Sequence, residues 1–424
     1  MQVFKNRDFR LLWIGEAISS LGDQFALIAL PWLALVLTGS GLALGTVLAL
    51  MAVPRAALMI IGGAYTDRLS PRRVMLLSNA VRLVAVTLLA GAVLAGAAQL
   101  WMLYAFALVF GIADAFFFPA QTSIVPALVP SEQLGQANAI VQGTAQFSVF
   151  LGPAIAGVLI AAFGSAAAAP STQGIGVAFV VDAASFLASL VTLWLIRSVA
   201  QSAAAQATSV VSAIGEAVRF IWNWPSMRLI VVLTMLLNLL IVGPIEVGMP
   251  VLAYARLPEG AAAFGTITAF FGLGSLIGLG AAAALPAPRP SLFSAVAIGA
   301  IAAAGVCLAL MGSVFATLPA IVIAFLIGVA LGFSNLLTIT WIQRRVPGPL
   351  MGRVMSVLML GSLGLVPVSE FIAGLFAQVN LTGLLVVGGG GMAIVALVSL
   401  LSPAIRLMGK EPVIEQSGSA PAAA

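Results

Sequence analysis

The sequence predicts an all-α polytopic membrane protein with twelve transmembrane helices, and three observations support this fold class. Hydrophobic residues make up 62% of the 424 residues and charged residues only 7%, whereas a soluble domain carries about 25% charged residues. The apolar stretches are long enough to cross a bilayer, which takes about 20 helical residues. Breaks that contain charges, Pro or Gly separate these stretches and leave room for about a dozen spans. A soluble enzyme is therefore excluded.

The spans are assigned in order along the chain. Six apolar stretches come first, near residues 11–37, 43–64, 74–96, 101–127, 138–163 and 175–196. Six more follow, near residues 228–253, 263–284, 292–311, 317–340, 352–378 and 383–405. The first stretch has a basic flank, as a signal peptide has, but it contains Glu16 and Asp23 and is too long for the apolar core of one. We therefore expect it to be an uncleaved first helix.

Alternate loops differ in their content of Lys and Arg, which indicates how the spans are oriented. The side that holds both chain ends carries 15 of the 18 basic residues, the opposite side has Arg256, and Arg55 and Arg82 fall within spans. Because cytoplasmic loops are enriched in Lys and Arg, we expect both termini in the cytoplasm and the chain in the cytoplasmic (inner) cell membrane. The net charge of +5 then reflects topology, and no nucleic-acid partner is expected.

The composition also excludes several kinds of chemistry. The chain has no histidine, and its one cysteine, Cys307, can form neither an internal disulfide nor a thiolate metal cluster. The two lysines, Lys5 and Lys410, are followed by Asn6 and Glu411, so no Gly-Lys-Ser/Thr phosphate loop exists. We expect no catalytic residues, no metal and no cofactor.

One long hydrophilic connection, residues 198–226, divides the spans six and six. Within it, apolar residues recur at steps of three and four, and these are Val211, Ile214, Val218, Ile221 and Trp222. This period predicts an amphipathic helix that lies on the inner leaflet. We therefore expect an N-terminal bundle (1–197), this linker (198–226), a C-terminal bundle (227–408) and a disordered cytoplasmic tail (409–424).

The two halves of the chain resemble each other when one is shifted by 217 residues. The Ile-Ala-Gly triplets at 155–157 and 372–374 coincide. The same offset relates turn and packing positions, namely Gly63 to Gly280, Pro71-Arg72 to Pro288-Arg289, Gly111 to Gly328, Phe116 to Phe333, Val129-Pro130 to Val346-Pro347 and Gly135 to Gly352. Two pseudo-symmetric six-helix halves with a substrate path between them are typical of secondary transporters.

The loop after the second span reads GGAYTDRLSPRR and begins at Gly62. It resembles the major facilitator superfamily signature Gly-x-x-x-Asp-Arg-x-Gly-Arg-Arg, with Ser70 in place of the later Gly and Pro71 in the first basic position. The resemblance implies a cytoplasmic gate, a charge latch that breaks when the halves rock. Its residues are Gly63, Asp67, Arg68, Arg72, Arg73 and, from the third span, Arg82. A plain basic loop with a turn is the alternative.

The fifth span contains Gly152-Pro153 and Gly157, with Ala156 between them. This stretch looks like the family's antiporter motif Gly-Pro-x-x-Gly-Gly, which is more typical of exporters than of sugar importers. Its proline and small residues suit a helix that bends, packs tightly and seals one side of the membrane during exchange. A simple packing motif is the alternative.

Residues 1 to about 408 are most similar to the macrolide and siderophore (enterobactin exporter-like) drug:proton antiporter branch of that superfamily. The cues are the opening Phe9-Arg10-Leu11-Leu12-Trp13, then Gly22-Asp23, Leu30-Pro31-Trp32 and Asp67-Arg68. The chain departs from many proton-coupled drug exporters at Ala107, where the fourth span of those exporters has an arginine. The proton-relay role of that arginine is therefore not carried over.

Ionisable residues inside a bilayer are costly unless they are paired or hydrated, so each is a functional candidate. The candidates for proton coupling or substrate binding are Asp23, Glu246, Glu370, Asp114 and Arg55. Asp23 lies near the middle of the first span, and a structural pair with Arg55 is the alternative for it. For Glu246 and Glu370 a structural hydrogen bond is the alternative, and for Asp114 a role in the latch. Asp182 is expected to partner a helix end, and Glu16 has no assigned role.

The resemblance implies a secondary active transporter that exports a small amphiphilic compound, such as a drug, macrolide or siderophore, by alternating access in exchange for protons. Its partners would be this substrate, protons and the lipid bilayer, and it would work as a monomer. A solute importer or facilitator of the same fold is one alternative. A membrane receptor or scaffold that transports nothing is another.

Overall fold

In a computed structural model of the chain, residues 3–164, 172–197, 210–286, 288–289 and 292–408 are described here. Within these ranges all regular structure is helical. Twelve helical segments are long and apolar enough to cross a membrane, which agrees with the predicted fold class and number of spans.

The first six spans are single helices. They are α1 (Arg7–Thr38), α2 (Gly41–Arg68), α3 (Pro71–Leu94), α4 (Leu100–Leu128), α5 (Leu134–Gly164) and α6 (Gln173–Leu195). Short 3₁₀ turns, η1 (Val3–Lys5) and η2 (Ser131–Gln133), precede α1 and α5. The ends follow from local chemistry: the side chain of Asn6 caps α1 by accepting from the backbone N–H of Asp8 at 2.9 Å, and Gly39, with φ of 62°, ends it.

Two of the last six spans are broken within the bilayer. The seventh consists of α8 (Pro225–Gly243), a π-helical turn η3 (Pro244–Gly248) and α9 (Met249–Arg256), and the eleventh of α13 (Gly348–Gly364) and α14 (Val366–Val379). Pro244 begins the π-helical turn, and Pro367 follows the break between α13 and α14. The missing N–H of each proline disturbs the helical hydrogen-bond ladder. The unbroken spans are α10 (Ala261–Ala284), α11 (Phe293–Met311), α12 (Thr317–Gln343) and α15 (Leu381–Ser399).

The end of the last span was predicted incorrectly. It ends at Ser399 rather than near 405, and a separate short helix, α16 (Pro403–Leu407), follows. Pro403 has no N–H to continue the ladder and disfavours helical backbone in the residue before it. Ser402 accordingly has extended backbone and precedes α16. The apolar run is longer than α15 because Leu400 and Leu401 lie in the turn between α15 and α16.

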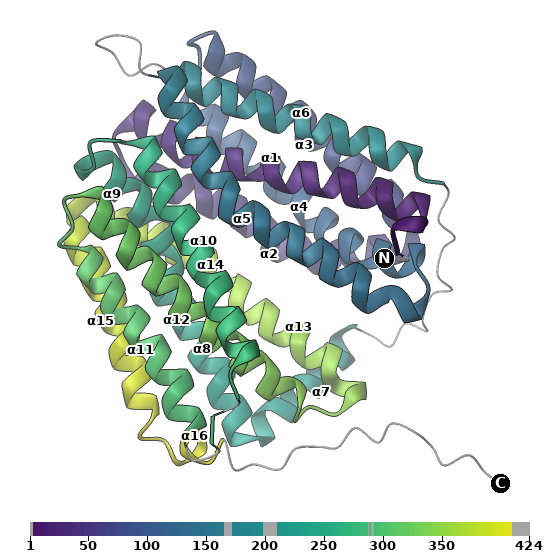
Figure 1. Cartoon of the computed structure of the whole chain (residues 1–424), viewed down its shortest axis with the longest axis vertical. Helices are drawn as coiled ribbons and strands as arrows, with labels where there is room; N and C mark the ends of the chain where they lie inside the picture. Colours follow the sequence, from purple (N-terminus) through teal and green to yellow (C-terminus); the bar gives the residue numbers. More distant parts are fainter. Residues whose placement is uncertain (1–2, 165–171, 198–209, 287, 290–291, 409–424) are drawn as a thin grey trace.

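The bundle has two ends, which we call the terminal face and the distal face. The terminal face holds Val3 and Met408, the first and last described residues, and the distal face holds the connection between α1 and α2. One large apolar core fills the distal part and joins both halves of the chain, for example Leu33 and Ile267. Toward the terminal face the core splits into one cluster from the first half and another from the second. The helices are therefore joined at one end and spread apart at the other (Figure 1).

The two halves meet through glycines, and one glycine of each contact lies at an equivalent position of the repeat. In the contact of α5 with α10, a Cβ added to Gly157 would lie 2.6 Å from the carbonyl oxygen of Ala261 and 2.9 Å from the Cα of Gly265. In the contact of α14 with α2, a Cβ added to Gly45 would lie 2.8 Å from the Cα of Gly374. Gly157 and Gly374 are separated by the repeat offset of 217 residues. The repeat seen in the sequence thus appears as two copies of one close helix contact.

Polar and aromatic contacts close the distal face as well. The hydroxyl of Ser40 donates to the side-chain oxygen of Gln378 at 2.8 Å. The rings of Trp32 and Tyr254 meet edge to face with centroids 5.5 Å apart. Both contacts join the first half of the chain to the second, which makes the distal face the closed end of the bundle.

The predicted amphipathic helix is present as α7 (Val210–Asn223). Its Ile221 is buried in the terminal-face cluster of the second half, and Glu216 forms an ion pair with Arg353 of α13. Val218 and Trp222 are exposed. The predicted boundaries at 197, 226 and 408 remain predictions, because residues 198–209 and the predicted tail from 409 lie outside the described ranges.

Candidate functional site

A cluster of charges lies inside the first half, centred on Arg82 of α3. The guanidinium forms an ion pair with Asp114 of α4 and stands 4.1 Å from the ring centre of Phe117, with Phe110 and Phe186 also within 6 Å. Only 4% of Arg82 is exposed. Aromatic faces on several sides hold the cation in place and exclude water from it.

Three more carboxyl groups lie within electrostatic range of Arg82. Glu16 and Asp23 come from α1, and Asp182 from α6. We call these five residues the Arg82 cluster: Arg82, Glu16, Asp23, Asp114 and Asp182. Four groups that can be anionic therefore surround one fixed cation.

Several oxygens of the Arg82 cluster have no hydrogen-bond partner among the described residues. Glu16 accepts from the amide of Gln121 through one oxygen, but its other oxygen is unpaired, as is one oxygen each of Asp23 and Asp182. Asp182 is fully buried. Because an unpaired buried anion costs several kcal/mol, these oxygens make the Arg82 cluster a candidate functional site.

A second group of charges lies where the two broken spans meet. Glu246 belongs to the π-helical turn η3 and Glu370 to α14, and their carboxyl groups act on each other electrostatically. Among the described residues, one oxygen of Glu370 has no hydrogen-bond partner. Arg55 of α2 acts on Glu370 electrostatically from the other half of the chain. The structure thus places Arg55 with Glu370, whereas Arg82 is the basic residue that acts on Asp23.

The same junction is fixed by a backbone contact. The hydroxyl of Ser369 donates to the carbonyl of Leu239 at 2.7 Å and accepts from the N–H of Gly243 at 2.8 Å. One side chain of α14 therefore satisfies backbone groups at the end of α8, next to the π-helical turn. π-Helical turns of this kind are frequent at functional sites.

The predicted gate residues are only partly visible. The side chains at positions 63, 67 and 68 lie outside the described part of the structure, so the charge latch stays a prediction. Arg72 donates to the backbone oxygens of Leu193 and Trp194, at 2.8 and 2.7 Å, and so caps the end of α6. Arg73 is exposed. Arg82 has Asp114 as its ion-pair partner.

The residues of the antiporter-like motif lie on α5 at the contacts with α1 and α10. A Cβ on Gly152 would lie 2.4 Å from the side chain of Gln24. Pro153 and Gly157 both face Gly265, whose added Cβ would lie 2.2 Å from the Pro153 carbonyl oxygen. The motif thus occupies the close contact between the two halves, which is where a seal would lie.

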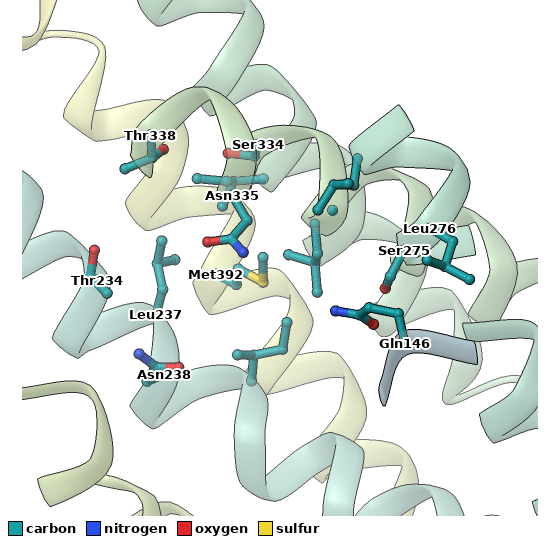
Figure 2. Close-up of a pocket in the computed structure, with 15 residues that line it drawn as sticks. Gln146, Thr234, Leu237, Asn238, Ser275, Leu276, Ser334, Asn335, Thr338 and Met392 are labelled. Atoms are coloured by element: carbon teal, nitrogen blue, oxygen red, sulfur yellow. The ribbon is translucent and has the colours of Figure 1, made fainter. Parts of the chain in front are cut away.

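A cavity of about 350 Å³ opens among the helices of the second half. Its polar lining comprises Gln146 of α5, Thr234 and Asn238 of α8, Ser275 of α10, and Ser334, Asn335 and Thr338 of α12. Figure 2 shows Asn238, Asn335 and Gln146 extending toward its interior from three helices. Gln146 is the one lining residue that comes from the first half. The volume is within the range of about 300–1,000 Å³ that small-molecule sites have.

The cavity lies next to the close contact between α5 and α10, on its terminal side. Going along α5 from the distal to the terminal face, the last close contact with a glycine of α10 is that of Val149 with Gly272, whose added Cβ would lie 3.0 Å from the Val149 carbonyl oxygen. Gln146 on α5 and Ser275 on α10 come next on the terminal side of this contact. The cavity therefore lies on the side of the seal toward which the two halves spread apart.

The sequence located the charged residues but missed this cavity. Asp182, expected at a helix end, belongs to the Arg82 cluster, as does the unassigned Glu16. The available signal for the cavity was the presence of amide side chains within spans, among them Asn238, Asn335 and Gln146. Sequence spacing could not show that three different helices bring these amides together.

Twelve spanning helices, two repeated halves and a cavity beside their contact define a multi-pass membrane transporter, and the chain belongs to the Major Facilitator Superfamily, whose family model matches residues 12–368. The chain is similar to the multidrug efflux pump Tap of Mycolicibacterium fortuitum, with 25% identity over 227 residues, or 51% of this chain and 53% of Tap. It is also similar to the uncharacterized MFS-type transporter YfiS of Bacillus subtilis (strain 168), with 26% identity over 229 residues, 53% of this chain and 51% of YfiS. The chain thus aligns with about half the length of these curated relatives.

Solved structures share the fold. The nucleoside transporter NupG has a TM-score of 0.71 at 12% identity, covering 96% of this chain and 100% of NupG. A bacterial homologue of the human lysosomal transporter Spinster, in an inward-facing and unoccupied conformation, has a TM-score of 0.65 at 16% identity, covering 95% of this chain and 96% of that homologue. At these identities the likeness concerns the fold alone.

Proposed function

We propose that this protein exports a small amphiphilic compound across the cytoplasmic membrane by alternating access, in exchange for protons. The Arg82 cluster is the observation that carries the proposal. Four carboxyl groups lie around one guanidinium, and two of them, Glu16 and Asp182, are buried. Among the described residues, Glu16, Asp23 and Asp182 each have an unpaired oxygen, and the charge of such a site changes by protonation. Asp23 is the coupling residue, because its helix α1 also reaches the second half through Trp32, whose ring meets that of Tyr254.

Sidedness follows from the basic loops, which place the terminal face in the cytoplasm. The conformation is then closed to the outside and open to the inside, as an exporter is when it takes up its substrate. Rocking of the two six-helix halves (1–197 and 227–408) about the glycine contacts would open the distal face and close the cytoplasmic one, where the charge latch forms. One chain supplies both gates and the cavity, so the transporter works as a monomer.

The export direction is supported by the efflux pump among the relatives and by the antiporter-like residues at the seal. A facilitator of the same fold would have no need for the buried carboxyl groups. A receptor or scaffold would tolerate their neutralisation. Neutralising Asp23 therefore separates the three possibilities.

The test is proton flux in proteoliposomes that contain a trapped pH dye. Macrolides, siderophores and cationic dyes are added to the parent and to Asp23→Asn. We expect at least one compound to drive proton movement in the parent, and this flux to be at least about tenfold lower in Asp23→Asn because the group that carries the proton is removed. The control is Glu132→Gln, which removes a carboxyl group from the exposed turn η2 and should leave the flux unchanged.

Substrate movement without proton movement in the parent would contradict antiport and favour a facilitator. Equal coupled flux in the parent and in Asp23→Asn would contradict the role of Asp23. Neither substrate nor proton movement with any compound would favour the receptor or scaffold.

A further inference from the structure

The lining of the cavity in the second half has an unusual chemical composition for a multidrug site. Among its fifteen lining residues there is no Asp, Glu, Lys or Arg, and no Phe, Tyr or Trp. All fifteen lining residues carry an amide or a hydroxyl group or are Gly, Met, Leu or Ile. The cavity therefore offers hydrogen bonds and apolar surface but no charge.

Such a lining disfavours organic cations. A cation that leaves water for a bilayer-buried site needs an opposite charge or an aromatic face to replace its hydration. The Arg82 cluster and the pair of Glu246 and Glu370 do not line the cavity. Organic anions are disfavoured for the same reason, since no Arg or Lys reaches it.

The amides of the cavity have unused hydrogen-bonding capacity. Within the described ranges, Asn238, Asn335 and Gln146 have no side-chain hydrogen bond to another protein group, whereas Ser334 donates to the carbonyl of Ala297 at 3.0 Å. An amide side chain both donates and accepts. Three free amides from α8, α12 and α5 therefore match a ligand that has amide, carbonyl or hydroxyl groups on several sides (Figure 2).

We infer that the cavity binds an uncharged, hydrogen-bonding amphiphile, with Asn335, Asn238 and Gln146 as its recognition residues. The inference rests on the proposed transport function and narrows its substrate class. Aliphatic lining such as Leu237, Leu276 and Leu331 takes the apolar part of the ligand. Gln146, the one lining residue from the first half, lets the bound ligand contact both halves and so report its presence to the half that holds the Arg82 cluster.

The experiment measures equilibrium binding to the purified full-length protein in lipid nanodiscs, without any ion gradient. The uncharged probes are chloramphenicol and thiamphenicol, each with an amide and two hydroxyl groups. The cationic probes are tetraphenylphosphonium and ethidium. We expect saturable binding of at least one uncharged probe and affinity at least about tenfold lower for both cations, since desolvation of a charge without a partner is costly.

Two substitutions at one position make the assignment specific. Asn335→Leu keeps a similar size but removes the hydrogen bonds, and should weaken binding of the uncharged probe by about tenfold. Asn335→Asp supplies a carboxylate and should strengthen tetraphenylphosphonium binding by about tenfold. The matched controls are Asn223→Leu and Asn223→Asp at the exposed end of α7, which should change neither affinity.

Stronger binding of the cations than of the uncharged probes by the parent would overturn the inference, and so would a failure of both uncharged probes to bind. Equal probe affinity in the parent and both Asn335 variants would remove Asn335 from the site. These outcomes can be told apart from a failure of antiport. If cations drive proton flux, the substrate class inferred here is wrong but antiport is supported. If uncharged probes bind and no proton flux occurs, the substrate class is supported and the protein is a facilitator.

Discussion

The two halves of the chain share one fold and differ in the chemistry at their centres. In the first half, Arg82 and four carboxyl groups fill the interior. In the second half, the corresponding region holds a cavity lined by amides, hydroxyls and aliphatic side chains. The difference teaches that, under the proposed antiport, proton and substrate would not have to compete for one group. Coupling would then depend on the movement of the halves relative to each other, because each ligand would be held mainly by one of them.

The largest effect is expected from Arg82→Gln. Loss of the guanidinium leaves Asp114, whose side chain is 20% exposed, without its ion-pair partner. Breaking a fully buried ion pair costs about 3–5 kcal/mol, and the partial exposure of Asp114 makes the cost here smaller. The measurement is thermal unfolding followed by a thiol-reactive dye on Cys307, the one cysteine of the chain, together with proton flux. We expect a large decrease in the unfolding temperature and loss of coupled flux.

The double variant Arg82→Gln with Asp114→Asn is the matched control. It removes both charges of the pair, so the unfolding temperature should recover toward that of the parent while coupled flux remains lost. Recovery of flux in the double variant would show that Arg82 is needed for stability alone, and the contrast between the two halves would lose its functional meaning.

A smaller effect is expected at the seal, where the two halves are alike. Gly157→Ala places a Cβ 2.6 Å from the Ala261 carbonyl oxygen and should destabilise the closed distal face by about 1–3 kcal/mol. Gly143→Ala on the same helix is the control, because no atom lies within 4 Å of its added Cβ. The measurement is labelling of a cysteine introduced at Ser40, which should become faster in Gly157→Ala only, both backgrounds having Cys307→Ser.

Equal labelling rates in the Gly157→Ala and Gly143→Ala backgrounds would contradict the assignment of this contact as a gate. The equivalent change at Gly374 sharpens the comparison. Its added Cβ would lie 2.9 Å from the Gly41 carbonyl oxygen, so the repeat predicts an effect of similar size from the other half.

The sequence predicted the part of this protein that depends on local composition. Twelve apolar stretches gave the spans, and the repeat offset correctly paired Gly157 with Gly374 before any contact was known. The helix end at Ser399 was missed because apolar length does not reveal the break before Pro403. The cavity was missed for a different reason: Asn238, Asn335 and Gln146 lie in separate spans, and only tertiary packing brings them together.

The sequence also did not predict which charged residues lie next to each other. Arg55 and Arg82 are both spanning arginines, and spacing alone made Arg55 a plausible partner of Asp23. In the structure, Arg82 acts electrostatically on Asp23, and Arg55 acts on Glu370. Arg55 acts on Glu370 because α2 packs against α14 across the contact between the halves. Which helices are neighbours decides the pairs, and that information lies outside any single span.

The smallest effect is expected from Glu370→Gln, which tests whether the second half has a proton site of its own. Glu370 and Glu246 act on each other electrostatically, and Gln has the size of Glu without its charge. We therefore expect coupled proton flux to change by less than about threefold, since the proposed coupling carboxyl lies in the other half. Asp23→Asn in the same assay supplies the contrast. Loss of flux in Glu370→Gln as complete as in Asp23→Asn would place protons in both halves, and the assignment of proton to one half and substrate to the other would fail.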